Sequence, residues 1–250
     1  MKKLTTILAS TIAAIALTAC ASGDPLAAAP STSSAPAGSS AAQPAIVVGS
    51  ANFPENELLA ELYAGALEAK SIQVTRKLNI ASRETYVPAL KSGEIDLIPE
   101  YTGAFAKYLN PDADTSDEAT ALASLKAALP ENLVALEPSS AQDKDSITVT
   151  KETADKYSLK TIEDLVPVAG ELVLGGPPEW KERAAGIPGL KKTYGLEFKE
   201  FKPLDVAGPL TVQALKNGQV QAANLFTTDP NIKAENFVVL DDPKNLFGAQ

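Results

Sequence analysis

The chain has 250 residues, a formal net charge of −9 at pH 7, no histidine and a single cysteine, Cys20. An acidic surface repels nucleic acid and anionic lipid headgroups, so we expect no nucleic-acid partner. Without histidine, and without cysteine in the predicted folded part, the usual nucleophile–base pairs and thiolate or imidazole metal sites are excluded. We therefore expect no enzyme activity, no cofactor and no metal, and one cysteine allows no intramolecular disulfide.

The N-terminal region predicts export rather than folded structure. Two lysines precede an apolar run at residues 4–19, which is shorter than the about 20 residues of a membrane-spanning helix. The run ends in Leu17-Thr18-Ala19-Cys20, which matches the lipobox of bacterial lipoproteins. We predict a signal peptide at 1–19 and lipidation of Cys20. Residues 20–45, rich in Ala, Ser, Pro and Gly, then form a disordered tether at the outer face of the cytoplasmic membrane.

The remaining chain alternates between predicted strands and helices. The β-branched run Ile46-Val47-Val48 leads directly into an amphipathic segment, and similar steps follow the strand-like runs at 72–80, 171–176 and 198–204. This alternation is typical of an α/β fold with largely parallel sheets, in which ligands bind beyond the carboxyl ends of the strands. The candidate site positions are therefore Ser50 to Phe53, Ala81 to Glu84, Tyr101-Thr102, Gly175 to Trp180 and Phe226 to Asp229.

Two segments of the sequence closely resemble each other. ALKSGEIDLIPEYTG spans residues 89–103 and ALKNGQVQAANLFTT spans residues 214–228. In each copy Ala-Leu-Lys-x-Gly predicts a helix end with a left-handed glycine, and a short strand follows. Tyr101 and Phe226 then occupy the same offset, each before a threonine. A helix, glycine and strand in this order are common in α/β proteins, but the matched aromatic and Thr indicate two half-sites, hence two lobes and one cleft.

These segments carry a family resemblance. The four stretches ANFPENELLAELYAGALEAK, ASRETYVPALKSGEIDLIPEYTG, LGGPPEWKERAAGIPGLKKTYGLEF and ALKNGQVQAANLFTTDP resemble the substrate-binding lipoproteins of glycine betaine, choline and related osmoprotectant ABC importers. The resemblance implies a type II periplasmic binding protein fold, with lobe 1 at 46–145, lobe 2 at 146–236 and a return crossing at 237–250. Because the family's chains normally continue further, it also implies that lobe 1 is incomplete.

The resemblance implies an aromatic cage for a quaternary ammonium group. Such a group offers no N–H donor, and aromatic faces attract its charge by about 0.5 to 2 kcal/mol per well-placed ring. Tyr101 matches one cage tyrosine, and Phe226 stands where relatives often carry a second. Two further cage positions are unfilled, one because Ile187 replaces a tyrosine, and Trp180 is the candidate that compensates, with lobe packing as its alternative role.

A zwitterionic ligand also needs partners for its carboxylate. Backbone amides at helix N-termini can bind it, and Arg83 or Arg183 can add a charged fork, with Arg183 favoured. The expected polar contacts, each of which could instead be a helix cap or surface residue, are Asn52, Thr102, Thr227 and Thr228.

The predicted function is capture of a quaternary-ammonium osmoprotectant by a monomer, which delivers it to the permease and ATPase subunits of an importer. Three alternatives remain open from sequence. The same fold could bind another zwitterion, a sulfur betaine or a non-amine solute. The protein could be a surface lipoprotein without a transport role, or a carboxylate-only hydrolase with Glu100 as the acid.

Overall fold

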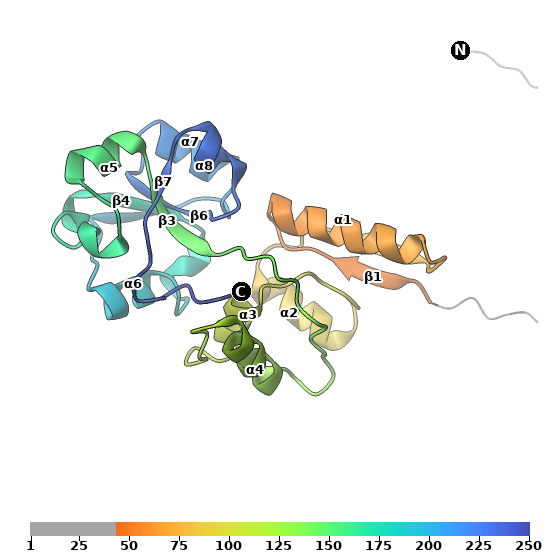
Figure 1. Ribbon diagram of the computed structural model, residues 1–250. Coiled ribbons are helices and arrows are strands. Elements are labelled where there is room, and N and C mark those ends of the chain that lie inside the picture. The colour runs from red at the N-terminus through yellow and green to blue at the C-terminus, as the bar shows by residue number, and fades with distance from the viewer. Residues whose placement is uncertain (1–43) are drawn as a thin grey trace, which may run out of the picture. The chain divides into compact units, whose positions relative to one another are not determined.

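The computed structural model describes residues 44–250 (Figure 1). The predicted signal peptide at 1–19, the lipidation site at Cys20 and all but the last two residues of the predicted tether at 20–45 lie outside the described residues. Within the described range, no helix combines the length and apolar character that crossing a membrane requires.

Lobe 1, residues 44–128, has a small parallel sheet with helices around it. Its elements are β1 (Ile46–Gly49), α1 (Pro54–Glu68), β2 (Val74–Lys77), α2 (Arg83–Ser92), α3 (Thr102–Leu109) and α4 (Glu118–Ala128). β1 and β2 pair in parallel, and Leu97 adds a single parallel bridge to Val48. Ala60 and Ala64 of α1 are fully buried against Val48, so α1 packs closely along β1, as Figure 1 shows.

Lobe 2, residues 145–240, is built on a five-stranded sheet in the order β5-β4-β6-β3-β7. Its strands and α-helices are β3 (Asp145–Val149), α5 (Lys151–Tyr157), β4 (Val173–Gly176), α6 (Ile187–Tyr194), β5 (Glu200–Pro203), α7 (Pro209–Lys216), β6 (Ala222–Phe226), α8 (Pro230–Ala234) and β7 (Val238–Val239). Its short 3-10 helices are Ile162–Leu165, Ala169–Glu171 and Pro178–Lys181.

The sheet of lobe 2 is mixed rather than mostly parallel. β4 is parallel to β5 and β6, as the strand–helix alternation predicts. β3, which brings the chain into the lobe, runs antiparallel to both of its neighbours, β6 and β7. The α/β class is confirmed, and only the relative direction of the strands at one side of the sheet differs from the prediction.

The two copies of the repeated sequence share a left-handed glycine, but only the second continues into a strand. The strand predicted in the first copy is wrong, because Leu97 makes only a single bridge there. Gly93 caps α2 with φ of 77°, and Gly218 follows α7 with φ of 68°, so both glycines adopt the expected left-handed conformation. Tyr101 is the N-cap of α3, and Phe226 is the last residue of β6. Each aromatic side chain therefore leaves the backbone just beyond the apolar stretch of its copy.

The C-terminal segment, residues 241–250, contacts both lobes. On lobe 2, Phe247 stacks on Trp180 with ring centroids 5.9 Å apart. On lobe 1, Ala249 N donates to Thr115 O at 2.9 Å. A Cβ added to Gly103 of α3 would lie 2.0 Å from the Ala249 carbonyl oxygen, so only glycine permits this close approach. The predicted crossing at 237–250 thus includes β7, which belongs to the sheet of lobe 2.

Candidate functional site

A cavity of about 50 Å³ lies where the two lobes meet. This is several times the minimum that holds one water molecule. Its lining residues are Ala51, Asn52, Phe53, Asn56, Ser82, Arg83, Tyr86, Tyr101, Ala104, Asp143, Asp145, Pro177, Trp180, Arg183, Val206, Asn224, Phe226 and Gln250. Both lobes, the connection between them and the C-terminal segment contribute, so the cavity exists only when all four are brought together.

Three aromatic rings form a continuous cluster in the wall of this cavity. Phe53, the N-cap of α1, lies between the other two: its ring centroid is 5.9 Å from that of Tyr101 and 4.9 Å from that of Phe226. The interplanar angles are 38° and 41°, so the rings are tilted rather than stacked. Trp180, 2% exposed, lines the same cavity from lobe 2 while it stacks on Phe247.

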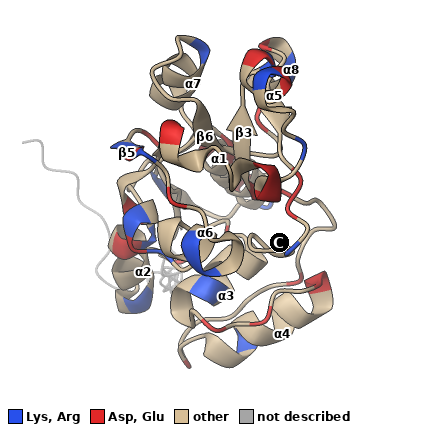
Figure 2. Ribbon diagram, turned by 90° about the vertical axis from the view of Figure 1, so that its left-hand side faces the viewer, with Lys and Arg blue, Asp and Glu red and all other residues tan. Residues whose placement is uncertain are grey.

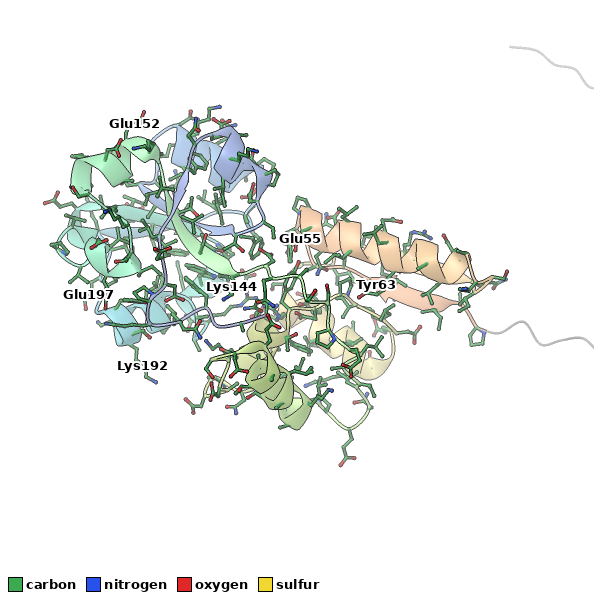
Figure 3. All side chains as sticks on the ribbon, viewed as in Figure 1. Glu55, Tyr63, Lys144, Glu152, Lys192 and Glu197 are labelled. Atoms are coloured by element: carbon green, nitrogen blue, oxygen red, sulfur yellow. The ribbon has the colours of Figure 1, made fainter. Side chains whose placement is uncertain are left out.

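Glu55 links this aromatic cluster to lobe 2. The Tyr101 hydroxyl donates to Glu55 Oε1 at 2.7 Å, and the Thr228 hydroxyl donates to Glu55 Oε2. Figure 3 shows Glu55 at the end of α1 that is nearest to lobe 2. Burial, with the hydrogen bond to Glu55, raises the pKa of Tyr101 far above its ordinary value, so the phenol stays protonated and continues to donate.

The two arginines of the cavity are already paired with carboxylates of lobe 1. Arg83 donates to both oxygens of Glu100, at 2.9 and 2.8 Å, and the Tyr86 hydroxyl donates to the same carboxylate. Arg183 of lobe 2 donates to Glu84 of α2, with a closest distance of 3.0 Å. Each guanidinium charge is therefore neutralised by the protein itself, and the Arg183 pair also joins the two lobes.

Two aspartates bring negative charge to the cavity. Asp145, at the start of β3, accepts a hydrogen bond from Asn224 Nδ2 at 2.8 Å. Asp143 is 7% exposed, and its Oδ1 accepts from Thr227 Oγ1 and Thr228 N, both at 3.2 Å. Burial raises the pKa of Asp145, and burial followed by the charge of Glu55 raises the pKa of Asp143 to about 7. Both shifts reflect anions held in a poorly hydrated space.

Two acceptor atoms of the cavity lining have no hydrogen-bond donor within residues 44–250, namely Asp143 Oδ2 and Asn224 Oδ1. In the same range, no group of three or more Asp, Glu, Cys or His side chains is arranged to hold a metal ion. The cavity thus combines an aromatic wall with buried acceptors, which is suited to binding an organic cation.

A family model for the substrate binding domain of ABC-type glycine betaine transport systems matches residues 44–250. The chain belongs to this family. The family resemblance stated from sequence is therefore confirmed, and members of this family are substrate-binding proteins that bind small solutes and interact with the permease and ATPase subunits of importers.

Individual relatives of this osmoprotectant-binding family support the assignment. The glycine betaine-binding protein YehZ of Escherichia coli K12 is 28% identical over 213 residues, which cover 80% of this chain and 70% of the relative. The ergothioneine transport permease/ergothioneine binding protein EgtU of Helicobacter pylori G27 is 29% identical over 205 residues, 81% of this chain but 36% of the relative. The chain therefore spans about a third of that longer protein.

A solved structure confirms the two-lobed fold of this family. The crystal structure of a glycine betaine/carnitine/choline ABC transporter protein matches with a TM-score of 0.60 and 25% identity, over 82% of this chain and 76% of that chain. Lactococcal OpuAC, in its closed-liganded conformation with glycine betaine, matches with a TM-score of 0.54 at 13% identity and so shows the fold alone.

The structure brings six of the nine ligand-contact residues predicted from sequence to the cavity, namely Asn52, Arg83, Tyr101, Trp180, Arg183 and Phe226. The three threonines take other positions in the described structure. Thr102 is the first residue of α3, Thr227 Oγ1 accepts from Lys144 N at 3.0 Å, and Thr228 donates to Glu55. The hydroxyls of Thr227 and Thr228 bond residues around the cavity, and none of the three threonines lines it.

Sequence reasoning missed several residues that line the cavity. Phe53 falls within a candidate stretch, but it reads as the start of an amphipathic helix rather than as a cage ring. Asp143 and Asp145 lie in a stretch that carries none of the predicted site residues. Asn224 stands inside the repeated sequence, two residues before Phe226, and this spacing in a strand places both side chains on one face of the sheet.

Proposed function

We propose that the protein captures a quaternary-ammonium osmoprotectant in the cavity between its lobes and delivers it to an ABC importer. The observation that carries this proposal is the cluster of Phe53, Tyr101 and Phe226 beside the buried Asp143 and the half-buried Asp145. Aromatic faces attract a methylated ammonium ion, and buried carboxylates add attraction that needs no hydrogen bond. We do not expect catalytic turnover.

Export and lipid anchoring belong to the same proposal. Cleavage before Cys20 and acylation of its thiol would hold the binding lobes at the outer face of the cytoplasmic membrane, where solute arrives. Globomycin treatment, which blocks lipoprotein signal peptidase, should leave a precursor, and Cys20→Ala should abolish the incorporation of labelled fatty acid into the protein. Unchanged labelling of the alanine variant would refute the anchor alone.

Ligand binding is tested by thermal shift and titration calorimetry with choline, glycine betaine, carnitine, proline betaine and ergothioneine. At least one quaternary amine should raise the unfolding temperature, because a ligand that binds only the folded state stabilises it by mass action. If none of the five binds, the proposed function is wrong.

The aromatic wall is tested with three variants. Tyr101→Ala should weaken binding of the quaternary amine at least about tenfold, or about 1.4 kcal/mol. Tyr101→Phe keeps the ring and should lose much less affinity for the quaternary amine. Tyr63→Ala is the matched control, since Tyr63 lies on α1 away from the cavity lining, is 47% exposed and is labelled in Figure 3. Equal affinities of wild type and Tyr101→Ala would contradict the aromatic-cage assignment.

A further inference from the structure

Two acceptor atoms in the cavity lack donors. Asp143 is 7% exposed and Asn224 is fully buried, and both side chains line the cavity. Asp143 Oδ2 and Asn224 Oδ1 accept no hydrogen bond from any residue of the described chain. A buried acceptor left in this state is costly, and most at a charged carboxylate, so such atoms in a binding cavity are expected to be satisfied by what binds there.

The neighbours of these two side chains fix which atoms are left free. Asn224 Nδ2 donates to the Asp145 carboxylate at 2.8 Å, and the reversed amide would oppose two acceptors, so Oδ1 must be the atom turned away from Asp145. Asp143 Oδ1 is held by Thr227 and Thr228, which leaves Oδ2 for another partner. With Asp143 ionised, the side chains that line the cavity include two acceptor atoms without donors, and a ligand that satisfies them must supply a donor.

This requirement separates the members of the proposed ligand class. In glycine betaine the nitrogen is fully methylated and the carboxylate only accepts, so the molecule has no hydrogen-bond donor. A quaternary amino alcohol carries the same trimethylammonium group and one O–H. We propose that the cavity selects a quaternary-ammonium alcohol of the choline class over a carboxylated betaine, with Asp143 Oδ2 accepting the ligand hydroxyl and Asn224 Oδ1 as the second acceptor.

The charges around the cavity favour the same ligand. Arg83 is bound by Glu100, and Arg183 is bound by Glu84, so within the described lining both guanidinium groups already have carboxylate partners. A ligand carboxylate could take over the charge of either arginine only by displacing its partner, and it would approach Asp143 as a like charge. A cation without a carboxylate avoids both costs.

The inference rests on the proposed function and can fail separately from it. Titration calorimetry on the full-length chain compares choline, its O-methyl ether (2-methoxyethyl)trimethylammonium, and glycine betaine. The ether keeps the charge and methyl groups but has no donor. Since a hydrogen bond to a charged acceptor is worth about 10- to 100-fold in affinity, choline should bind the wild type at least about tenfold more tightly than the ether or glycine betaine.

A variant assigns this preference to Asp143. In Asp143→Asn the ratio of choline to ether affinities should fall to within about threefold, because the charged acceptor is gone. Asp117→Asn, at the N-cap of α4 and outside the cavity lining, is the matched control and should keep the wild-type ratio. An unchanged ratio in Asp143→Asn overturns the role of Asp143.

The wild-type comparison decides the selectivity even if the variant does not fold. Equal binding of choline and its ether, or tighter binding of glycine betaine, overturns the selectivity and leaves the proposed function standing. Absence of binding by all three, and by the wider set of quaternary amines, overturns both.

Discussion

The affinity of the protein for a cationic quaternary amine should depend on pH through Asp143. Burial first, and the charge of Glu55 second, raise the pKa of this carboxyl from 3.8 to about 7 in the unliganded protein. The groups that face it are Glu55 at the start of α1, the Tyr101 phenol, and Thr227 and Thr228 after β6. A bound cation favours the ionised carboxylate, so binding should lower the pKa and release a proton.

The size of the effect follows from the ionised fraction. With a pKa of about 7, roughly one in ten molecules carries ionised Asp143 at pH 6 and nine in ten at pH 8. If the ionised form binds the cation, affinity should rise about tenfold between these pH values, or about 1.4 kcal/mol. Above pH 8 the curve should flatten, because nearly every molecule is already ionised.

Calorimetry in buffers of different ionisation enthalpy measures both the proton release on binding and the pH dependence of affinity. The apparent enthalpy at pH 7 should vary with the buffer and report a fractional proton released per ligand, and Asp143→Asn should abolish both the buffer dependence and the pH slope. Affinity that is constant from pH 6 to 8 in the wild type, or a slope that survives in Asp143→Asn, would refute the reasoning.

The raised pKa of Asp143 makes the unliganded protein less stable as pH rises, whereas it makes ligand affinity rise. The folded state holds the Asp143 proton more tightly than the unfolded chain does, so the contribution of Asp143 to stability is present below about pH 4 and is lost as pH rises towards 7. Unliganded wild type should therefore lose stability over this range relative to Asp143→Asn, as measured by urea unfolding. A cationic ligand should restore part of that loss in the wild type.

Three further outcomes are expected. Phe53→Ala should weaken quaternary amine binding about 2- to 30-fold in calorimetry, because one ring is worth about 0.5 to 2 kcal/mol; unchanged affinity would exclude its ring from the cage. A double-mutant cycle of Glu84→Gln and Arg183→Lys on ligand affinity should give a coupling below about 1 kcal/mol, since the pair is partly exposed, and a coupling above about 2 kcal/mol would contradict this. Asp242→Asn should lower the free energy of unfolding in urea by about 1.5 to 3 kcal/mol. The reason is that the Asp242 carboxylate accepts from two backbone amides of the C-terminal segment, at 3.0 and 2.9 Å. An unchanged unfolding midpoint would contradict this.

The local features of the fold could be predicted from sequence. Left-handed glycines at Gly93 and Gly218 and the apolar strand before Phe226 follow from short-range patterns, since helix ends and strand periodicity depend on neighbouring residues. The direction of β3 could not be predicted in this way. It is set by pairing with β6, whose residues lie about 80 positions further along the chain.

The candidate site also has some residues that short-range sequence patterns predict and others that only the folded chain reveals. Tyr101 and Phe226 were found because each ends a recognisable pattern, and ligands of α/β folds bind beyond the ends of such apolar segments. The partners of Arg83 and Arg183 were missed, because Glu84 lies 99 positions from Arg183 and only the folded chain brings them within hydrogen-bonding distance. These ion pairs neutralise the charge of both arginines, and their predicted contact with the ligand stays a prediction.

The Glu55 side chain affects three properties of the cavity: its negative charge, the contact between the lobes and the protonation of Asp143. Its carboxylate accepts from the Tyr101 phenol and from Thr228 of lobe 2. After burial, its charge is the second cause that raises the pKa of Asp143. Figure 2 shows acidic and basic residues distributed along both lobes. Glu55 and Asp143 add a local concentration of negative charge at the cavity. When the lobes meet as they do here, Glu55 and Asp143 repel each other unless a proton or a cation lies near them. A cationic ligand therefore stabilises the contact between the lobes by the same electrostatic attraction that binds it, whereas a zwitterion brings a carboxylate that reduces this gain.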